Sequence, residues 1–201
     1  MDIPQNQSRG RGIWGFQLTL VLVTFVIVLC LSNTLIYGFS EATTRTSIRW
    51  TARMSAIYFS MAFAASALHS VVQKSWSWWL LMNRKFIGIS FAFTHLIHLG
   101  VLVILQYQFH PVFELAKVSS LIGGGMAYAF LVLMLITSFK GPRSLISNKN
   151  WTLLHTVGGY WIWFIFIKSY WKRAGTESEY IPLVVLLAVV LFLRVWKKRK
   201  T

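Results

Sequence analysis

Long apolar segments alternate with short polar stretches along the whole chain. A helix needs about 20 mostly apolar residues to cross the hydrocarbon core of a bilayer, and about 17 is the lower bound. Five segments reach the full length and the last is nearer the lower bound. They run approximately over residues 13–37, 52–72, 86–106, 118–138, 151–170 and 180–196.

Backbone polar groups in lipid must be bonded within the crossing segment or across a closed barrel, so only helices and β-barrels span membranes. The strands of a barrel would give alternating stretches of about 10 residues, which these runs do not resemble. The pattern therefore predicts an all-α, polytopic six-helix bundle. We expect residues 1–201 to form a single transmembrane domain without a soluble domain.

The first apolar segment has a second interpretation, as the apolar region of a signal peptide. It is too long for that role, and no small-residue cleavage motif follows Tyr37. An uncleaved first span is the preferred interpretation.

Composition supports a membrane protein. Of the 201 residues, 56% are hydrophobic and 12% are charged, whereas soluble domains carry about a quarter charged residues. The mean hydropathy is +0.58. These values exclude an ordinary cytosolic globule, and the lack of long polar tracts excludes a disordered chain.

The chain is strongly basic, with 20 Lys and Arg against 5 Asp and Glu and a net charge of +15. Such a charge fits nucleic-acid binding, an anionic lipid surface, or the positively charged inner loops of a membrane protein. If the N-terminus is inside, thirteen basic residues lie in inner stretches and seven in outer ones. The inner residues are Arg9, Arg11, Lys74, Arg84, Lys85, Lys140, Arg143, Lys149, Arg194, Lys197, Lys198, Arg199 and Lys200.

The positive-inside rule then predicts that both termini are cytoplasmic. We expect a multi-pass protein of the plasma (inner) membrane that contacts the lipid bilayer. Nucleic acid is not expected as a partner, because the basic residues are scattered among loops.

Four histidines fall within the predicted spans: His69, His95, His98 and His155. Ionisable groups inside a membrane are costly and usually functional. Each of them could simply form a hydrogen bond across the bundle. However, almost no carboxylate is available in the spans to pair with them, and a haem iron is the partner that best suits neutral imidazoles. Zinc catalysis fits less well, because acidic ligands and a buried general base are missing.

The rise of about 1.5 Å per residue gives each histidine a depth. His69 and His155 lie at the same level, about 6 Å from the inner face. His95 and His98 lie about 17 and 21 Å from it. Two axial ligands of one haem must lie at the same depth, and His69 and His155 meet that condition near the cytoplasm. His98 or His95 would instead serve a site in the outer half of the membrane. His95 and His155 differ in depth by about 11 Å, so helix tilt would have to remove that difference before both could bind one haem. This arrangement is therefore less favoured than the others.

Small residues occur beside these histidines. Gly158 and Gly159 follow His155, Gly88 precedes His95 on the same face, and residues 123–125 are glycines. They indicate either a slot for a flat cofactor or close contact between helices.

Three stretches carry a family resemblance. They are Arg84-Lys85-Phe86-Ile87-Gly88-Ile89 continuing to His98, Thr137-Ser138-Phe139, and Trp151-Thr152-Leu153-Leu154-His155. Together they resemble the ferric reductase-like transmembrane domain. That superfamily includes NADPH oxidase cores, metalloreductases and the haem-binding membrane subunit of periplasmic methionine sulfoxide reductase.

The resemblance implies one or two b-type haems, with His98 and His155 as axial ligands of the iron. It also implies electron transfer across the membrane to an acceptor on the outer side, so any enzyme activity would be that of an oxidoreductase subunit. Relatives with two haems carry a second histidine about thirteen or fourteen residues from each of these. The corresponding positions here are Arg84 or Lys85, and Lys168 or Ser169.

These departures leave several arrangements open. His69 could replace the missing inner ligand, and the outer site could be singly ligated, differently ligated or absent. An alternative is a non-redox scaffold or assembly subunit that keeps the fold with partial or no haem ligation. A small-solute transporter is a weaker alternative, because broken helices and acidic midplane residues are lacking.

The electron donor would be a separate protein or molecule. The chain has no Gly-x-Gly-x-x-Gly stretch that would indicate a dinucleotide site. FAD or FMN would therefore act only through a partner flavoprotein, and membrane quinol is the other candidate donor.

Overall fold

Every regular element in residues 14–110 and 118–200, which the computed structural model describes, is helical. This confirms the all-α prediction for that part of the chain. The elements are α1 (Phe16–Tyr37), α2 (Glu41–Val72), α3 (Ser75–Phe109), α4 (Val118–Ile136), α5 (Lys140–Ser144), α6 (Asn148–Ala174), the 3₁₀ turn η2 (Ser178–Tyr180) and α7 (Ile181–Lys200).

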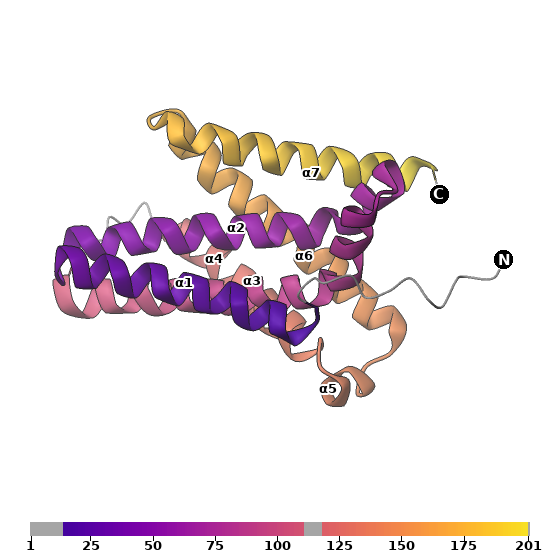
Figure 1. The fold of residues 1–201 in the computed structure, drawn as a ribbon, viewed down its shortest axis with the longest axis horizontal. Helices are drawn as coiled ribbons and strands as arrows, with labels where there is room; N and C mark the ends of the chain where they lie inside the picture. Colours follow the sequence, from indigo (N-terminus) through magenta and orange to yellow (C-terminus); the bar gives the residue numbers. More distant parts are fainter. Residues whose placement is uncertain (1–13, 111–117, 201) are drawn as a thin grey trace.

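Helix α2 occupies the centre of the molecule (Figure 1). It packs against α1 and α3 on one side and against α7 on the other. Helix α6 crosses obliquely and packs against α4 and α7. The short helix α5 and the C-terminal end of α7 lie at the same end of the molecule. The result is a bundle in which α3 and α6, the two helices with the family-like motifs, lie on different sides of a shared core.

Within the part of the chain that the structure describes, four helices are long and apolar enough to cross a membrane: α1, α2, α3 and the segment Ser178–Lys197. Helix α4 contributes a shorter apolar stretch, Ile122–Ile136. Helix α6 is 27 residues long, but polar residues such as His155 and Lys168 interrupt its apolar stretch. Four such helices indicate a multi-pass membrane protein.

Two helices begin earlier than the apolar pattern predicts. Helix α2 starts at Glu41 rather than near residue 52, and α3 starts at Ser75 rather than near residue 86. The α2 start is capped, because Ser40 Oγ accepts a hydrogen bond from the Thr43 backbone N–H at 3.2 Å. Tight turns precede both helices, at Gly38 (φ 76°) and Gln73 (φ 49°). Polar first turns therefore extend both helices beyond their apolar segments.

Helix α5 was not predicted. It has only five residues, Lys140–Ser144, and includes Gly141 and Pro142. Proline is tolerated in the first turn of a helix, where its missing N–H has no intrahelical partner. A helix of this length has no apolar period for a sequence pattern to detect.

The polar first turns of α2 are buried against the neighbouring helices. Thr43, Ser47 and Thr51 are buried. The Asn33 side chain of α1 donates from Nδ2 to the Thr43 carbonyl oxygen and to Ser47 Oγ, both at 3.0 Å. These contacts satisfy the polar groups that the α1–α2 turn brings together, and they attach α1 to the bundle.

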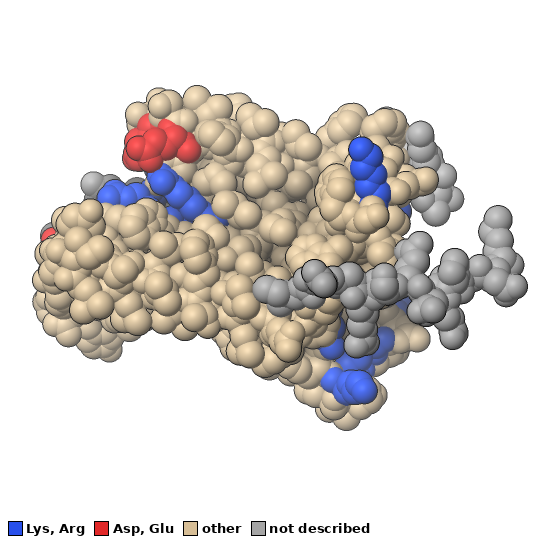
Figure 2. Space-filling view, in the orientation of Figure 1, with Lys and Arg blue, Asp and Glu red and all other residues tan. Residues whose placement is uncertain are grey.

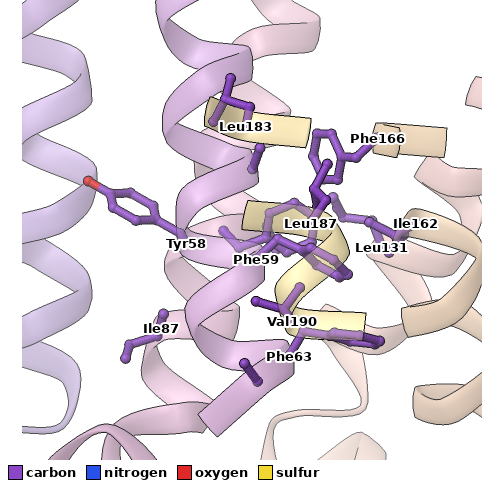
Figure 3. Packing of buried hydrophobic residues seen from close by; sticks show 14 of the residues in the cluster. Tyr58, Phe59, Phe63, Ile87, Leu131, Ile162, Phe166, Leu183, Leu187 and Val190 are labelled. Atoms are coloured by element: carbon purple, nitrogen blue, oxygen red, sulfur yellow. The ribbon is translucent and has the colours of Figure 1, made fainter. Parts of the chain in front are cut away.

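The core lies between α2, α3, α6 and α7 (Figure 3). Phe59 and Phe63 of α2 stack on each other with ring centroids 5.1 Å apart. Phe59 also packs against Phe91 of α3 and Phe166 of α6. Tyr58 points the opposite way and donates its hydroxyl to the Leu22 carbonyl oxygen of α1 at 3.3 Å. Helix α2 therefore supplies core contacts in both directions.

Charged side chains gather at the two ends of the molecule (Figure 2). Acidic side chains lie at only one end of the face shown, where they adjoin Lys and Arg side chains. One contact there is the ion pair between Arg53 of α2 and Glu179 of η2, at 2.7 Å. Among the described residues on this face, the opposite end shows Lys and Arg side chains and no Asp or Glu. An uncharged middle with charged ends suits a membrane-spanning bundle.

Candidate functional site

His95 and His98 lie one turn apart on α3, and both line a cavity of about 260 Å³, hereafter the His95 cavity. Their rings stack on each other, with centroids 5.2 Å apart and planes inclined by 22°. The ring of Tyr128 from α4 stacks on the other side of His95 at 4.9 Å. The two imidazoles therefore form one wall of the cavity.

Hydroxyl groups of α2 fix the orientation of both rings. His98 Nδ1 lies 3.0 Å from Thr51 Oγ1, and His95 Nδ1 lies 3.0 Å from Ser55 Oγ. Thr51 and Ser55 are one turn apart on α2, so the two contacts are side by side. The packing of α2 against α3 thus orients both imidazoles through their Nδ1 atoms.

The hydroxyl protons show which ring nitrogens carry hydrogen. Thr51 Oγ1 donates to the Ser47 carbonyl oxygen at 2.8 Å, and Ser55 Oγ donates to the Ala52 carbonyl oxygen at 2.9 Å. Because each hydroxyl has a single proton, each must accept from the histidine Nδ1–H. Both imidazoles therefore carry hydrogen on Nδ1 and a lone pair on Nε2.

His95 Nε2 has no hydrogen-bond partner among the residues that the structure describes, and the His98 ring also forms a hydrogen bond with the Ile48 backbone. A neutral histidine with Nδ1–H bound to an oxygen and a bare Nε2 is the form that ligates iron or other metals.

The His95 cavity has an apolar middle and a cationic end. Leu102, Leu131 and Ile162 are among its apolar lining residues. Arg49 and Arg173 line its polar end. Arg173 Nη1 donates to the hydroxyl of Tyr180 at 3.2 Å.

His155 lines a second cavity of about 380 Å³, hereafter the His155 cavity. Its Nε2 lies 3.2 Å from Thr137 Oγ1, whose proton goes to the Leu133 carbonyl oxygen at 2.7 Å. Thr137 must therefore accept from the Nε2–H of His155. Trp151 packs on the ring at 4.2 Å and donates from Nε1 to the Thr137 carbonyl oxygen at 3.1 Å. His155 is held as firmly as the α3 pair, but with the opposite nitrogen protonated.

Four cations line the His155 cavity, and no carboxylate does. They come from three helices: Arg84 and Lys85 from α3, Arg143 from α5 and Arg194 from α7. The rest of the lining is mainly apolar. This cavity therefore combines a positive rim with an apolar interior.

His69 lines neither of these two cavities. Its Nδ1 lies 2.9 Å from Ser77 Oγ at the start of α3, and its ring packs against Trp78 at 5.4 Å. The structure thus brings His95 together with His98, while His69 and His155 lie in separate environments.

The two cavities adjoin each other, because Phe91 and Leu131 line both of them. The Phe91 ring lies 5.7 Å from the His95 ring. The positions where two-haem relatives carry further histidines also line the cavities: Arg84 and Lys85 the His155 cavity, and Ser169 the His95 cavity. Lys168, the alternative to Ser169 at that position, lines neither cavity.

The glycines near the histidines lie in two kinds of surroundings, a contact between helices and the lining of a cavity. Gly158 packs against α4, since a Cβ there would lie 2.7 Å from Met134 Sδ and 3.2 Å from Phe130 Cβ. Gly88 and Gly159 line the His155 cavity.

The residues present fit haem with one axial imidazole better than with two. The Nε2 atoms of His95 and His98 suit an iron ligand, but both rings stand on the same helix and thus on one wall. No group of three or more His, Cys, Asp or Glu that could hold a metal ion occurs in residues 14–110 and 118–200. The His95 cavity, at about 260 Å³, is below the lower limit of about 300 Å³ for ligand pockets, and the His155 cavity, at about 380 Å³, is just above it.

Sequence reasoning identified the histidines but missed Thr51 and Ser55, and it noted Thr137 only as part of a family-like stretch. A signal was present, since Thr51 and Ser55 are four residues apart and His95 and His98 are three apart, which puts each pair on one helix face. Only the structure shows which faces of α2 and α3 meet.

Comparison of the chain with protein-family models, with curated proteins and with solved structures gives no match. The resemblance to the ferric reductase-like transmembrane domain therefore depends only on the three stretches that carry it.

Proposed function

We propose that this chain is an integral membrane b-type haem protein that transfers electrons across the membrane to an acceptor on its outer side. The observation that carries the proposal is the state of the α3 histidines. Both bond through Nδ1 to an α2 hydroxyl, and both residues line the His95 cavity. A hydrogen bond that orients the ring in this way is typical of metal-ligating histidines.

His98 or His95 would hold the iron from the α3 side of the His95 cavity. The two rings stack at 5.2 Å on one helix, so they cannot occupy opposite axial positions of one haem. His98 is the residue that the family resemblance favours, and His95 is its neighbour. Haem would supply one-electron redox chemistry between its ferric and ferrous states.

The other lining residues have supporting roles. Leu131 and Ile162 exclude water, which influences the redox potential of a buried haem. Arg49 and Arg173 provide positive charge at the polar end of the cavity, where they suit carboxylate groups of a bound porphyrin. The shared lining residue Phe91 joins this site to the His155 cavity, where a second haem on His155 would require its Nε2 to leave Thr137.

We infer six membrane crossings with both termini in the cytoplasm. The four helices of spanning length support a multi-pass chain, and the excess of basic residues in the expected inner stretches supports the orientation. A separate flavoprotein or membrane quinol would supply the electrons, and the bilayer would be the plasma membrane.

Absorption spectroscopy tests the proposal. The full chain, expressed with sufficient haem and purified in detergent, should show a Soret band and a reduced α-band, and a pyridine haemochrome assay should count the haem. The proposal fails if neither band appears, or if His98→Ala and His95→Ala leave the haem content unchanged.

One observation favours a second candidate, a non-redox scaffold or assembly subunit. In the His155 cavity, the only imidazole among the lining residues has its Nε2 bonded to Thr137, and Arg84 and Lys85 stand where relatives carry histidine. A chain that binds a stable membrane partner and contains no haem would favour this candidate.

A further inference from the structure

The His155 cavity carries positive charge that no carboxylate of the described residues neutralises. The acidic residues in residues 14–110 and 118–200 are Glu41, Glu177 and Glu179. Glu41 is the first residue of α2, and Glu179 forms an ion pair with Arg53. Acidic side chains gather at one end of the face shown in Figure 2. Arg84, Lys85, Arg143 and Arg194 line the cavity at the opposite end.

Two of these guanidinium groups are held in position without a carboxylate. Arg194 donates to the Phe63 carbonyl oxygen at 2.9 Å and lies 4.1 Å above the centre of the Phe63 ring. Arg143 donates to the Ile146 carbonyl oxygen at 2.9 Å and packs over Trp151 at 5.2 Å. Arg143 also donates from Nη2 to Asn148 Oδ1. These partners are all uncharged, so both cations keep their charge unneutralised and retain further N–H groups for an external anion.

The other two cations are accessible. Arg84 and Lys85 are exposed, neither side chain takes part in the ion pairs of the described residues, and Lys85 Nζ lies 5.9 Å from the centre of the Phe86 ring. Four like charges around one opening repel each other, and an anion would relieve that repulsion. The remaining lining is apolar and includes Ile89, Leu131 and Leu135.

We propose that the His155 cavity binds an anionic phospholipid, with the phosphate between the four cations and part of an acyl chain along the apolar lining. Arginine recognises phosphate through paired hydrogen bonds. Basic pockets between transmembrane helices at the cytoplasmic face bind anionic headgroups. This inference uses the membrane placement given under the proposed function, but it does not depend on haem in the His95 cavity.

Native mass spectrometry of the full chain in neutral detergent tests the assignment. The probes are phosphatidylglycerol, phosphatidylcholine with the same acyl chains, and inorganic phosphate. We expect phosphatidylglycerol to be retained in preference to the other two. Loss of one charged hydrogen bond is worth at least about 1.5 kcal/mol, so Arg84→Gln and Arg143→Gln should each weaken retention about tenfold.

Lys172→Gln is the matched control, because Lys172 is exposed near the end of α6 and lines neither cavity. Circular dichroism and thermal melting establish that each variant is folded. Equal retention of phosphatidylglycerol and phosphatidylcholine, or an equal loss in Lys172→Gln, would overturn the proposal. Binding of inorganic phosphate as tight as that of the lipid would also overturn it, since the apolar lining would then contribute nothing.

The haem content of the same variants separates this inference from the proposed function. If Arg84→Gln and Arg143→Gln lose haem absorbance together with lipid retention, the cavity belongs to haem and the lipid assignment is wrong. If lipid retention alone falls, the two sites are distinct. If wild type contains no haem but retains phosphatidylglycerol, the electron-transfer proposal fails and the lipid site stands.

Discussion

His98 Nδ1 and Thr51 Oγ1 lie 3.0 Å apart, across the interface between α3 and α2. Because Thr51 donates its own proton to the Ser47 carbonyl oxygen, it accepts the proton of His98 Nδ1. The contact therefore determines that Nε2 is the nitrogen with a lone pair. Ser55 makes the equivalent contact with His95. These two contacts join α2 to α3, and a hydrogen bond of this kind also commonly orients a ligand histidine.

Thr51→Val tests this orientation. Valine keeps the shape of threonine but removes the acceptor for His98 Nδ1–H. Loss of a residue that hydrogen-bonds to a metal-ligating histidine lowers metal affinity about 10–100-fold, so we expect haem affinity to fall by a factor in that range. Haem titration of the purified apoprotein, followed by Soret absorbance, measures it.

Thr34→Val is the matched control for that variant. Thr34 Oγ1 also donates to a carbonyl oxygen one turn back, that of Cys30, but it lies on α1 and lines neither cavity. Unchanged haem affinity in Thr51→Val, or the same loss in both variants, would contradict the role given to Thr51.

Gly158→Ala tests the contact between α6 and α4. The added Cβ would lie 3.2 Å from Phe130 Cβ and 2.7 Å from Met134 Sδ. Phe130 Cβ is fixed to its backbone, so the helices must separate. Overpacking of this kind costs about 1–3 kcal/mol, and the melting temperature in detergent should fall.

The control is Gly125→Ala, where no atom lies within 4 Å of the new Cβ. Alanine favours a helix over glycine by about 1 kcal/mol, so this variant should be as stable as wild type or more stable. Equal melting temperatures for the two variants would show that α4 and α6 do not pack as described.

Asn33→Ala tests how α1 is attached to the bundle. Asn33 is buried and donates to Thr43 and Ser47 of α2. Interhelical hydrogen bonds in membranes contribute about 0.6 kcal/mol on average and up to about 1.7. We expect a loss in this range in a denaturant titration.

Ser32→Ala provides the comparison, because Ser32 bonds only to the Leu29 carbonyl oxygen of its own helix. If Ser32→Ala destabilises the protein as much as Asn33→Ala does, the bond between α1 and α2 has no special role.

The topology can be tested with single cysteines in a Cys30→Ala background, since Cys30 is the only cysteine. Lys149 and Lys172 are exposed near opposite ends of α6. With cytoplasmic termini and six crossings, a membrane-impermeant maleimide added to intact cells should label Lys172→Cys but not Lys149→Cys. The reverse pattern, or labelling of both, would exclude this topology.

Much of the fold could be predicted from the apolar pattern. Each of the six apolar segments corresponds to one long helix. The helix starts at Glu41 and Ser75 could not be predicted in this way, because polar turns carry no apolar signal. Those turns are helical because their polar groups find partners in adjacent helices, as Asn33 does for Thr43 and Ser47.

The candidate site was predictable only in part. His95 and His98 stand out as ionisable groups in an apolar segment. Equal depth suggested that His69 and His155 form a pair, but depth does not determine which way a side chain faces. His69 faces Ser77 and Trp78 instead, at the turn between α2 and α3. The cationic lining of the His155 cavity could not be predicted from the sequence either, because its residues come from three separate helices.

The central claim is that the α3 histidines hold a haem, and the haem content of His95→Ala/His98→Ala tests it most directly. His110→Asn is the control, because His110 is exposed at the end of α3 with φ 43°, a conformation that asparagine tolerates. We predict a Soret band and a pyridine haemochrome signal in wild type and in His110→Asn, and the loss of both in the double variant. Haem content in the double variant equal to wild type, or no haem in wild type after haem-replete expression, would contradict the claim.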